Sequence, residues 1–258
     1  MKCTLLGTSS AVGMPAPLNT NETYNKRTRP SLLIETDNVT LLFDASPDIK
    51  QQSNNRFDSL DGVFLTHHHH DHASGLREIN HTTLDSKKVV FNPEDIELDD
   101  WLNKEYAVYC SKQTLDLLKT NMNYVINNDN MEFRIIKDSE KIFIDNLKIT
   151  PFKTNHTDGY LGYKIESDNK CVVYHPDYGK LDTNVEFNNV DTLVVDGGAA
   201  VGMEIHNSKQ ELIELINNIN ADNLLFTNVS EFIIQSSTDE MIRKSDWSDA
   251  IVEDGYTF

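Results

Sequence analysis

The sequence has few cysteines and no long apolar run. Its three cysteines, Cys3, Cys110 and Cys171, are far apart and form no C-x-x-C pair. This set cannot build a disulfide framework and is typical of reduced, buried thiols in a cytoplasmic protein. No apolar run approaches the roughly 18 residues of a membrane span. The apolar stretch in MKCTLLGTSS is too short for a signal peptide. We therefore expect a cytoplasmic protein that has no membrane partner.

Basic residues are also scarce. Lys and Arg together number 23 against 41 Asp and Glu, so the net charge is −18. Such a chain repels long polyanions, because nucleic-acid binding depends on the neutralisation of phosphates by Lys and Arg. The one concentrated basic stretch is KRTR at 26–29. The charge argues against nucleic acid as a partner and favours a small substrate, although solubility alone would also explain it.

Short strand-like runs dominate the chain, and a turn at Asp37-Asn38 indicates a hairpin. No repeat, linker or domain boundary separates them, so we expect one domain over 1–258. The strand-like runs cover 2–6, 31–36, 39–44, 63–66, 89–92, 107–110, 131–136, 142–144, 147–152, 162–166, 171–174, 193–196 and 224–227.

Helical patterns are fewer and cover 112–121 and 208–218. The second begins with a capping box formed by Ser208 and Glu211, which marks its start. Polar stretches at 92–100 and 121–130 are expected as surface loops. Together these patterns predict an α/β (α+β) fold of two mixed sheets with helices outside.

Residues 64–75 read FLTHHHHDHASG and contain a pattern of metal ligands. A purification tag would lie at a terminus, whereas this run follows an apolar stretch inside the chain. Side chains of an extended segment alternate in direction, so His67 and His69 point the same way. Asp71 and His72 then enter a turn. Imidazole and carboxylate are ligands for zinc, manganese or iron, so the H-x-H-x-D-H spacing predicts a metal site, with His68 and His70 as spacers.

The chain resembles the metallo-β-lactamase fold superfamily over essentially its whole length. Among its branches it is most similar to that of phosphoribosyl 1,2-cyclic phosphate phosphodiesterase. Besides LDGVFLTHHHHDHASGLREIN, the resemblance is carried by LLGTSSAVGMPAP and RTRPSLLIETDNVTLLFDASPDIKQQ. It implies a four-layer αβ/βα sandwich with two divalent metal ions, zinc or manganese, at one edge between the sheets.

The resemblance also implies the ligand set. The first ion would be held by His67, His69 and His156, the second by Asp71 and His72, and Asp177 would bridge them. A bridging aspartate sets two ions about 3.5–4 Å apart, which suits an in-line displacement at phosphorus. His175, two residues before Asp177, is expected to have a supporting role.

One position departs from the family pattern. The branch closes its second metal site with a histidine near the C-terminus, where this chain has Asn228, and Glu231 stands at a second histidine position. An amide oxygen is a weak ligand for zinc, while a carboxylate is adequate. The alternatives are replacement by Glu231, a harder ion such as manganese, or weak occupancy of the second site.

Two further sets of residues are expected at the site. The resemblance implies that His206 assists the leaving group, as histidine titrates near neutrality, and Asp71 is the other expected catalytic residue. Ser9 and Ser10, in a loop rich in hydroxyl and amide donors, could line the pocket. Arg29 either anchors a phosphate or forms a structural ion pair.

The resulting expectation is a metal-dependent phosphodiesterase. It would hydrolyse a small cyclic phosphate, either a cyclic nucleotide or a phosphoribosyl cyclic phosphate, by metal-bound hydroxide. The alternatives are an RNA 3′-processing nuclease, a lactone or thioester hydrolase, and a degenerate single-metal protein that binds a nucleotide-like ligand. A homodimer is left open.

Overall fold

The computed structural model describes residues 1–16, 26–53, 60–81, 106–127, 131–198, 208–229 and 248–258. Within them the chain forms two sheets of seven and six strands. In order along the first sheet lie β13 (Tyr256–Thr257), β1 (Lys2–Gly7), β2 (Ser31–Glu35), β3 (Thr40–Phe43), β4 (Gly62–Phe64), β5 (Tyr106–Cys110) and β6 (Met131–Ile135). In order along the second lie β12 (Asn223–Thr227), β11 (Thr192–Asp196), β10 (Lys170–His175), β9 (Leu161–Ser167), β8 (Leu147–Lys153) and β7 (Ile142–Ile144).

Both sheets are mixed. Strands β1, β2 and β3 pair antiparallel, and β3 to β6 pair parallel. In the second sheet β10, β11 and β12 are parallel, while β7 to β10 alternate in direction. All five residues of β11 are buried, as expected for a strand that is covered on both faces. The predicted hairpin at Asp37-Asn38 is confirmed by the antiparallel pairing of β2 with β3.

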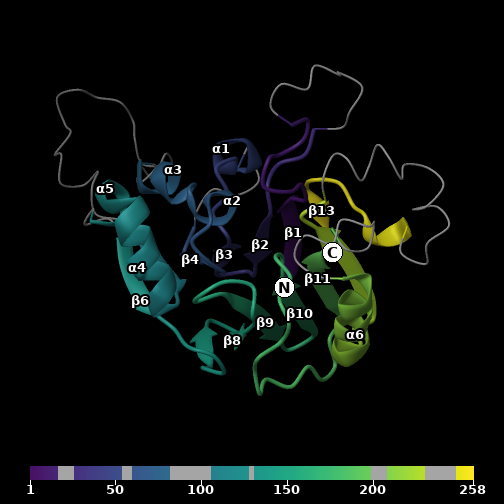
Figure 1. The fold of residues 1–258 in the computed structure, drawn as a ribbon. Coiled ribbons are helices and arrows are strands. Elements are labelled where there is room, and N and C mark those ends of the chain that lie inside the picture. The colour runs from purple at the N-terminus through teal and green to yellow at the C-terminus, as the bar shows by residue number, and fades with distance from the viewer. Residues whose placement is uncertain (17–25, 54–59, 82–105, 128–130, 199–207, 230–247) are drawn as a thin grey trace.

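The helices form the two outer layers (Figure 1). The first sheet carries α1 (Ile49–Gln52), α2 (His70–Ala73), α3 (Leu76–His81), α4 (Lys112–Asn121) and α5 (Asn123–Ile126). The second carries α6 (Lys209–Ile219), which buries Leu212, Leu215 and Ile219. The predicted capping box is present, since the Ser208 hydroxyl accepts from the Glu211 N–H and the Glu211 carboxylate accepts from Ser208. A short 3-10 helix, Ser248–Ala250, packs near β12.

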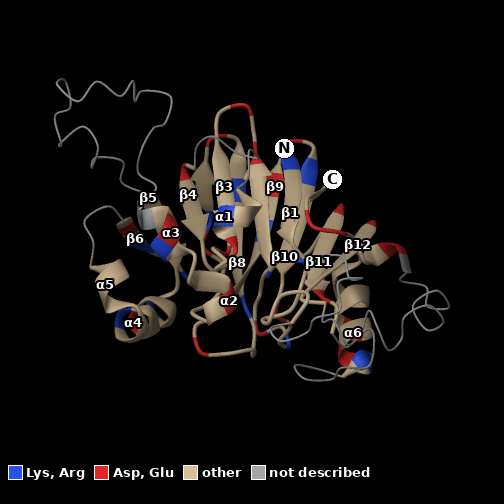
Figure 2. Cartoon of the chain, turned by 90° about the horizontal axis from the view of Figure 1, so that it is seen from above, with Lys and Arg blue, Asp and Glu red and all other residues tan. Residues whose placement is uncertain are grey.

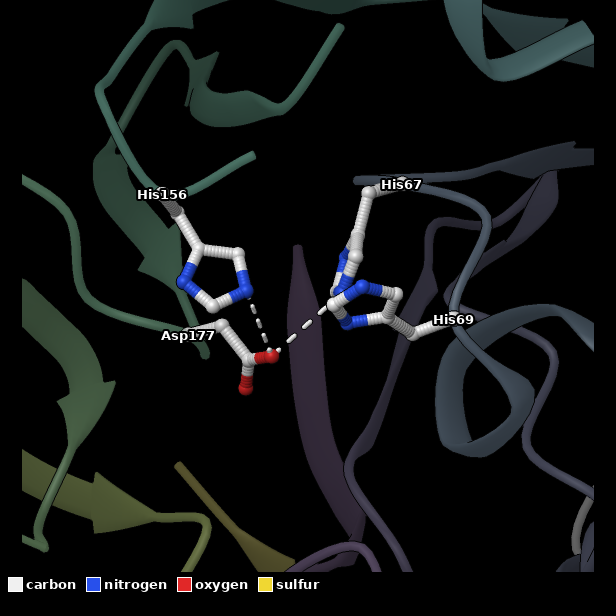
Figure 3. Close-up of side chains that lie close together, drawn as sticks. All are labelled: His67, His69, His156 and Asp177. Carbon is white, nitrogen blue, oxygen red and sulfur yellow. Dashed lines mark ion pairs between the residues drawn. The ribbon is translucent and has the colours of Figure 1, made fainter. Parts of the chain in front are cut away.

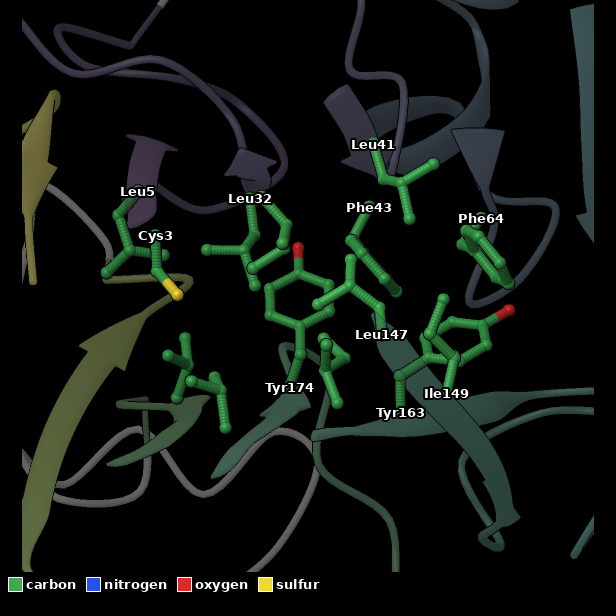
Figure 4. Close-up of a cluster of buried hydrophobic side chains, with 14 of the residues drawn as sticks. Cys3, Leu5, Leu32, Leu41, Phe43, Phe64, Leu147, Ile149, Tyr163 and Tyr174 are labelled. Carbon is green, nitrogen blue, oxygen red and sulfur yellow. The ribbon is translucent and has the colours of Figure 1, made fainter. Parts of the chain in front are cut away.

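The main core lies between the two sheets, where Figure 4 shows side chains from both of them interleaved. Phe43 stacks on Phe64 with ring centroids 4.9 Å apart, and Tyr163 meets both rings edge-on. Separate apolar clusters fill the space between each sheet and its helices. The four layers of the predicted αβ/βα sandwich are therefore observed.

The stretch 121–130 is not a plain surface loop, because α5 lies within it and buries Val125 and Ile126. Two apolar residues in a polar stretch are too few to show helical periodicity. The strand predicted at 89–92 and the loop at 92–100 lie outside the described residues.

Other sequence predictions concern the cysteines and the membrane. The three cysteines are buried and unpaired as predicted, and burial raises the pKa of the Cys110 thiol to about 12. Within the described ranges, no helix has the length and apolar character needed to cross a membrane. Lys and Arg are scattered over separate elements rather than gathered on one of them (Figure 2).

The strand directions bring several chain segments to one edge of the sandwich. Strands β3 and β4 end at this edge, as do β8, β10, β11 and β12 of the second sheet. The two sheets are tied there by the Leu161 N–H, which donates to the Thr66 carbonyl at 2.9 Å. Polar side chains that follow these strands therefore converge, and this edge is where ligands bind in parallel α/β sheets.

Candidate metal centre

The structure brings six of the predicted ligands into two groups that share one carboxylate. In each group one possible ligand atom per residue lies within 4.8 Å of the others. The first group consists of His67, His69, His156 and Asp177, and the second of Asp71, His72 and Asp177. Figure 3 shows the first group, with the three rings and the carboxylate directed toward a common point. His68 and His70, the predicted spacers, belong to neither group.

Each ligand is placed by the end of a strand or by a short helix. The segment that follows β4 carries His67 and His69, the segment after β8 carries His156, and the one after β10 carries Asp177. Asp71 and His72 do not lie in a simple turn as predicted, since they belong to α2, whose N-cap is His69. The helical turn folds the second half of the motif back beside the first, so one short segment serves both groups.

Asp177 uses its two oxygens for different groups. Its Oδ2 lies 3.4 Å from His67 Nε2 and 3.3 Å from His156 Nε2. Its Oδ1 lies 3.3 Å from His72 Nε2, which is also 3.3 Å from Asp71 Oδ2. A carboxylate with one oxygen toward each group is the arrangement expected of a bridging ligand.

These separations fit a metal ion better than hydrogen bonds. Ligand atoms about 2.0–2.1 Å from a tetrahedral zinc ion lie about 3.3–3.4 Å from one another. Within the described part of the chain, the buried Nε2 atoms of His67 and His72 make no hydrogen bond, although carboxylate oxygens are close to both. Buried polar atoms are normally satisfied, so the donor set fits divalent metal ions.

The buried charges and imidazoles of the two groups shift one another's pKa values. Burial alone would raise the pKa of Asp177, but the charge of His72 and the nearby nitrogens of His156 and His67 hold it well below its usual range. Burial opposes protonation of His72, yet Asp177 and Asp44 raise its pKa well above the ordinary value. Burial and the charge of His72 lower the pKa of His67 to about 3.

Asp44 orients the second group, and sequence reasoning missed it. This fully buried residue follows β3, and its Oδ2 lies 2.8 Å from His72 Nδ1. Its carboxylate also accepts from the N–H and hydroxyl of Thr66 and from the Tyr174 hydroxyl. A carboxylate on the far nitrogen of a ligand histidine sets the ring orientation and raises its basicity. An acidic residue directly after a buried strand was the available signal, in FDASPD.

Replacing Asp44 with asparagine should weaken metal binding at the second group by about 10–100-fold, because His72 loses the carboxylate that orients it. Isothermal titration of metal-free protein with zinc measures the effect. Asp145→Asn is a matched control, since Asp145 has the same left-handed backbone, with φ of 51° against 63° at Asp44, but lies outside the site. Equal affinities in the two variants would contradict the role of Asp44.

His175 has the contacts of a supporting residue, as expected. Its Nδ1 lies 3.0 Å from the Tyr160 hydroxyl, which in turn accepts from the Asp177 N–H. Its Nε2 lies 3.2 Å from the Gly179 carbonyl. Burial lowers the pKa of His175 from 6.5 to about 4. The neutral ring thus links the strand end that carries Asp177 to the loop behind it.

This lowered pKa predicts a loss of stability in acid. As pH falls below 6.5 the unfolded chain binds a proton at His175 before the folded chain does, and the folded form follows only near 4. Acidification from about pH 7 to about pH 5 should therefore cost about 2 kcal/mol at this residue. In urea unfolding of the metal-free proteins, the free energy of unfolding of His175→Gln should fall by about 2 kcal/mol less than that of the wild type over this pH range. An identical fall in the two proteins would contradict the lowered pKa of His175.

Asn228 occupies the position where the family pattern has a ligand histidine. It follows β12 with a left-handed backbone, φ 55°, and is buried. Its side-chain Nδ2 donates to Asp177 Oδ1 at 2.8 Å and to Asp196 Oδ2 at 3.3 Å. Asp196, at the end of β11, was not singled out from the sequence. The amide is thus oriented as a hydrogen-bond donor rather than as a metal ligand.

Of the other residues predicted at the site, the structure describes Ser9, Ser10 and Arg29. The loop with Ser9 and Ser10 lies beside the segment after β12, since Ser10 N–H donates to the Val229 carbonyl, and Ser9 is buried. Arg29 donates to both oxygens of Asp48 and to loop carbonyls, which favours the structural ion pair. His206 and Glu231 lie outside the described residues, so their predicted roles stay predictions.

A family model for the "Beta-lactamase superfamily domain" matches residues 39–227, which is most of the chain. The chain belongs to the beta-lactamase superfamily. This match spans the histidine motif, His156 and Asp177, and ends one residue before Asn228. Membership in the superfamily and the two donor groups together fit the binding of divalent metal ions.

Two curated relatives match part of the chain. An octanoyltransferase from Porphyromonas gingivalis is 31% identical over an alignment of 180 residues, with 64% of this chain and 33% of that protein covered. A ribonuclease Z from Archaeoglobus fulgidus is 26% identical over 174 residues, 66% of this chain and 49% of that protein. This superfamily member therefore spans only about a third to a half of the length of these relatives.

Solved structures match the whole chain and bear out the predicted fold. A diphosphatase from the PhnP family superposes with a TM-score of 0.76 at 19% identity, and covers 100% of this chain and 96% of its own. Zinc-bound PqqB from Methylobacterium extorquens has a TM-score of 0.77 at 17% identity, with 100% and 99% covered. The metallo-beta-lactamase fold protein YhfI from Bacillus subtilis has a TM-score of 0.71 at 17% identity, with 100% and 98% covered. The fold is thus the metallo-β-lactamase fold.

Proposed function

We propose that this protein is a metal-dependent phosphodiesterase that hydrolyses a small cyclic phosphate, either a cyclic nucleotide or a phosphoribosyl cyclic phosphate. The observation that carries the proposal is the pair of donor groups that share Asp177. Two divalent ions that share a bridging carboxylate can hold the attacking and leaving oxygens of an in-line displacement at phosphorus. A diphosphatase of the PhnP family has the same fold, so this fold is compatible with an enzyme that acts on phosphate groups.

The side chains of the site have distinct roles in this proposal. When bound, divalent ions supply Lewis acidity and an activated water. Asp44 and Thr66 hold the rings of His72 and His67 with their Nε2 atoms toward the other donors, because each contacts the Nδ1 atom that faces away from the group. His206 would give a proton to the departing oxygen. The ligands would be His67, His69, His156, Asp71, His72 and the shared Asp177.

The charge distribution supports a small substrate. The net charge is −18, and the basic stretch at 26–29 offers little to a polyanion. Arg27 is buried and donates to the Thr8 hydroxyl and the Val252 carbonyl, while Arg29 is held by Asp48. Because Arg27 is buried and Arg29 is paired with Asp48, a long phosphate backbone gains few contacts from these two arginines. A compact phosphate ester needs only the ions and a few donors.

RNA 3′-end processing is the second candidate, because the chain is 26% identical to part of a ribonuclease Z. The same paired donor groups would serve cleavage of an RNA phosphodiester. The net negative charge disfavours this candidate, since RNA affinity rests on Lys and Arg contacts.

That the protein forms a homodimer stays a prediction.

The test is hydrolysis by protein reconstituted with zinc or with manganese. The substrates are 2′,3′- and 3′,5′-cyclic nucleotides, phosphoribosyl 1,2-cyclic phosphate, a precursor tRNA, and lactone and thioester substrates. We expect cleavage of at least one cyclic phosphate and its loss in His67→Ala. His70→Ala is the matched control from the same motif, because His70 is exposed and belongs to neither donor group.

Each alternative has its own outcome in this panel. Cleavage of precursor tRNA without cyclic phosphates would favour the nuclease, and ester hydrolysis alone would favour the lactone or thioester hydrolase. A cyclic nucleotide recovered unchanged from a tight complex with metal-loaded protein would favour a binding protein. Any of these three results would overturn the proposed activity.

A further inference from the structure

The two donor groups are chemically unequal. The first contains three imidazoles and one carboxylate, which make a complete tetrahedral set for zinc. The second contains one imidazole and two carboxylates, and one of these carboxylates is the shared Asp177. Among the described residues it therefore has only three donors, mostly oxygen, and such a set is weaker for zinc.

Asn228 adds a hydrogen-bond donor beside the second group. Its Nδ2 lies 2.8 Å from Asp177 Oδ1, the same oxygen that faces His72 Nε2 at 3.3 Å. The positive end of an N–H dipole on this oxygen reduces the negative charge available to a cation. The amide therefore competes with an ion in the second group and leaves Asp177 Oδ2, which faces the first group, untouched.

The orientation of this amide is set by two acceptors. Nδ2 carries two hydrogens, and the acceptors within reach are Asp177 Oδ1 and, at 3.3 Å, Asp196 Oδ2. Rotation of the amide by half a turn would place its oxygen against two carboxylates and lose both hydrogen bonds. Offering its oxygen to an ion is thus unfavourable for Asn228, which remains a donor.

We propose that the protein binds one divalent ion tightly at the first group and a second ion far more weakly, and that Asn228 sets this difference. The inference rests on the metal-binding part of the proposed function and is independent of the substrate. Zinc is the tight ion, because the first group has three imidazole ligands. Replacing the amide donor with an acceptor should strengthen the second group about tenfold or more, the size of effect seen for groups that contact metal ligands.

The test is Asn228→Asp, which keeps the shape of the side chain and exchanges its donor for an acceptor. Aspartate tolerates the left-handed backbone at this position. Asn189→Asp is the matched control, because Asn189 is exposed and has φ 53° against 55° at Asn228. Each protein is dialysed against buffered zinc and its bound metal is counted, and stepwise affinities follow from calorimetric titration of metal-free protein.

We expect about one zinc per chain in the wild type and in Asn189→Asp, and about two in Asn228→Asp. Metal-free Asn228→Asp should also melt at a lower temperature than the wild type, because the new carboxylate faces Asp177 and Asp196, and zinc should reverse this loss. Should Asn228→Asp not fold, Asn228→His replaces the amide with a neutral ring that has one acceptor nitrogen free for an ion, and it should also bind about two zinc ions. Histidine also tolerates this backbone.

The outcomes separate this inference from the proposed function. Equal and tight binding of two ions by the wild type would overturn the inference, as would one ion in every variant. A single tight ion without phosphodiesterase activity would overturn the proposed activity alone. A wild type that binds no zinc would overturn both.

Discussion

Replacing Asp177 with asparagine should weaken metal binding at both donor groups and lower hydrolysis by more than about 100-fold. Loss of a side chain that merely contacts a metal ligand already costs about 10–100-fold. Asp177 contributes one oxygen to each group, with Oδ2 at 3.4 Å from His67 Nε2 and Oδ1 at 3.3 Å from His72 Nε2. An asparagine at this position has one oxygen, which is a weak ligand, and one nitrogen, which is a hydrogen-bond donor. At most one of the two groups therefore keeps an oxygen ligand from residue 177.

Metal content by mass spectrometry and the rate on the best substrate measure this effect together. Asp182→Asn is the control, because Asp182 is an exposed aspartate of the same region that pairs with Lys153. The metal content of the control should equal that of the wild type. Retention of the full metal content by Asp177→Asn would show that Asp177 does not bridge the groups.

Replacing Gly179 with alanine should displace His156 and lower hydrolysis by about 100-fold, the cost of a misplacement near 1 Å. A Cβ at Gly179 would lie 2.3 Å from the His156 backbone nitrogen and 2.8 Å from its Cα. Both are backbone atoms, so the conflict cannot be relieved by a rotamer change. The overpacking should also destabilise the fold by about 1–3 kcal/mol.

Gly62→Ala is the matched control for this substitution. Gly62 begins β4, the strand that leads to the histidine motif, and its new Cβ would have no neighbour closer than 3.4 Å, an ordinary contact. Urea unfolding and zinc titration of the two variants give the comparison. Zinc affinity equal to that of the wild type in Gly179→Ala would show that the loop of His156 adjusts without cost.

Some of the site was readable from local sequence. The four side chains of the H-x-H-x-D-H motif lie within six residues, so their spacing alone indicates a metal site. Apolar alternation located most strands, and the Ser208 capping box located the start of α6. His156 and Asp177 carry no local pattern, and only the resemblance to a family indicated them. Asp44 and Asp196 were missed for the same reason, since a single acidic residue after a strand is common.

The sequence by itself determined the composition of the site: the histidine motif, the acidic charge and the absence of a histidine at position 228. Tertiary structure decided how these parts meet. Six strands that end at one edge bring together residues as far apart as Asp44 and Asn228, and no local spacing encodes such contacts. It also decided the role of Asn228, because an amide acts as donor or ligand according to its neighbours. Two carboxylates face its nitrogen here, so it donates.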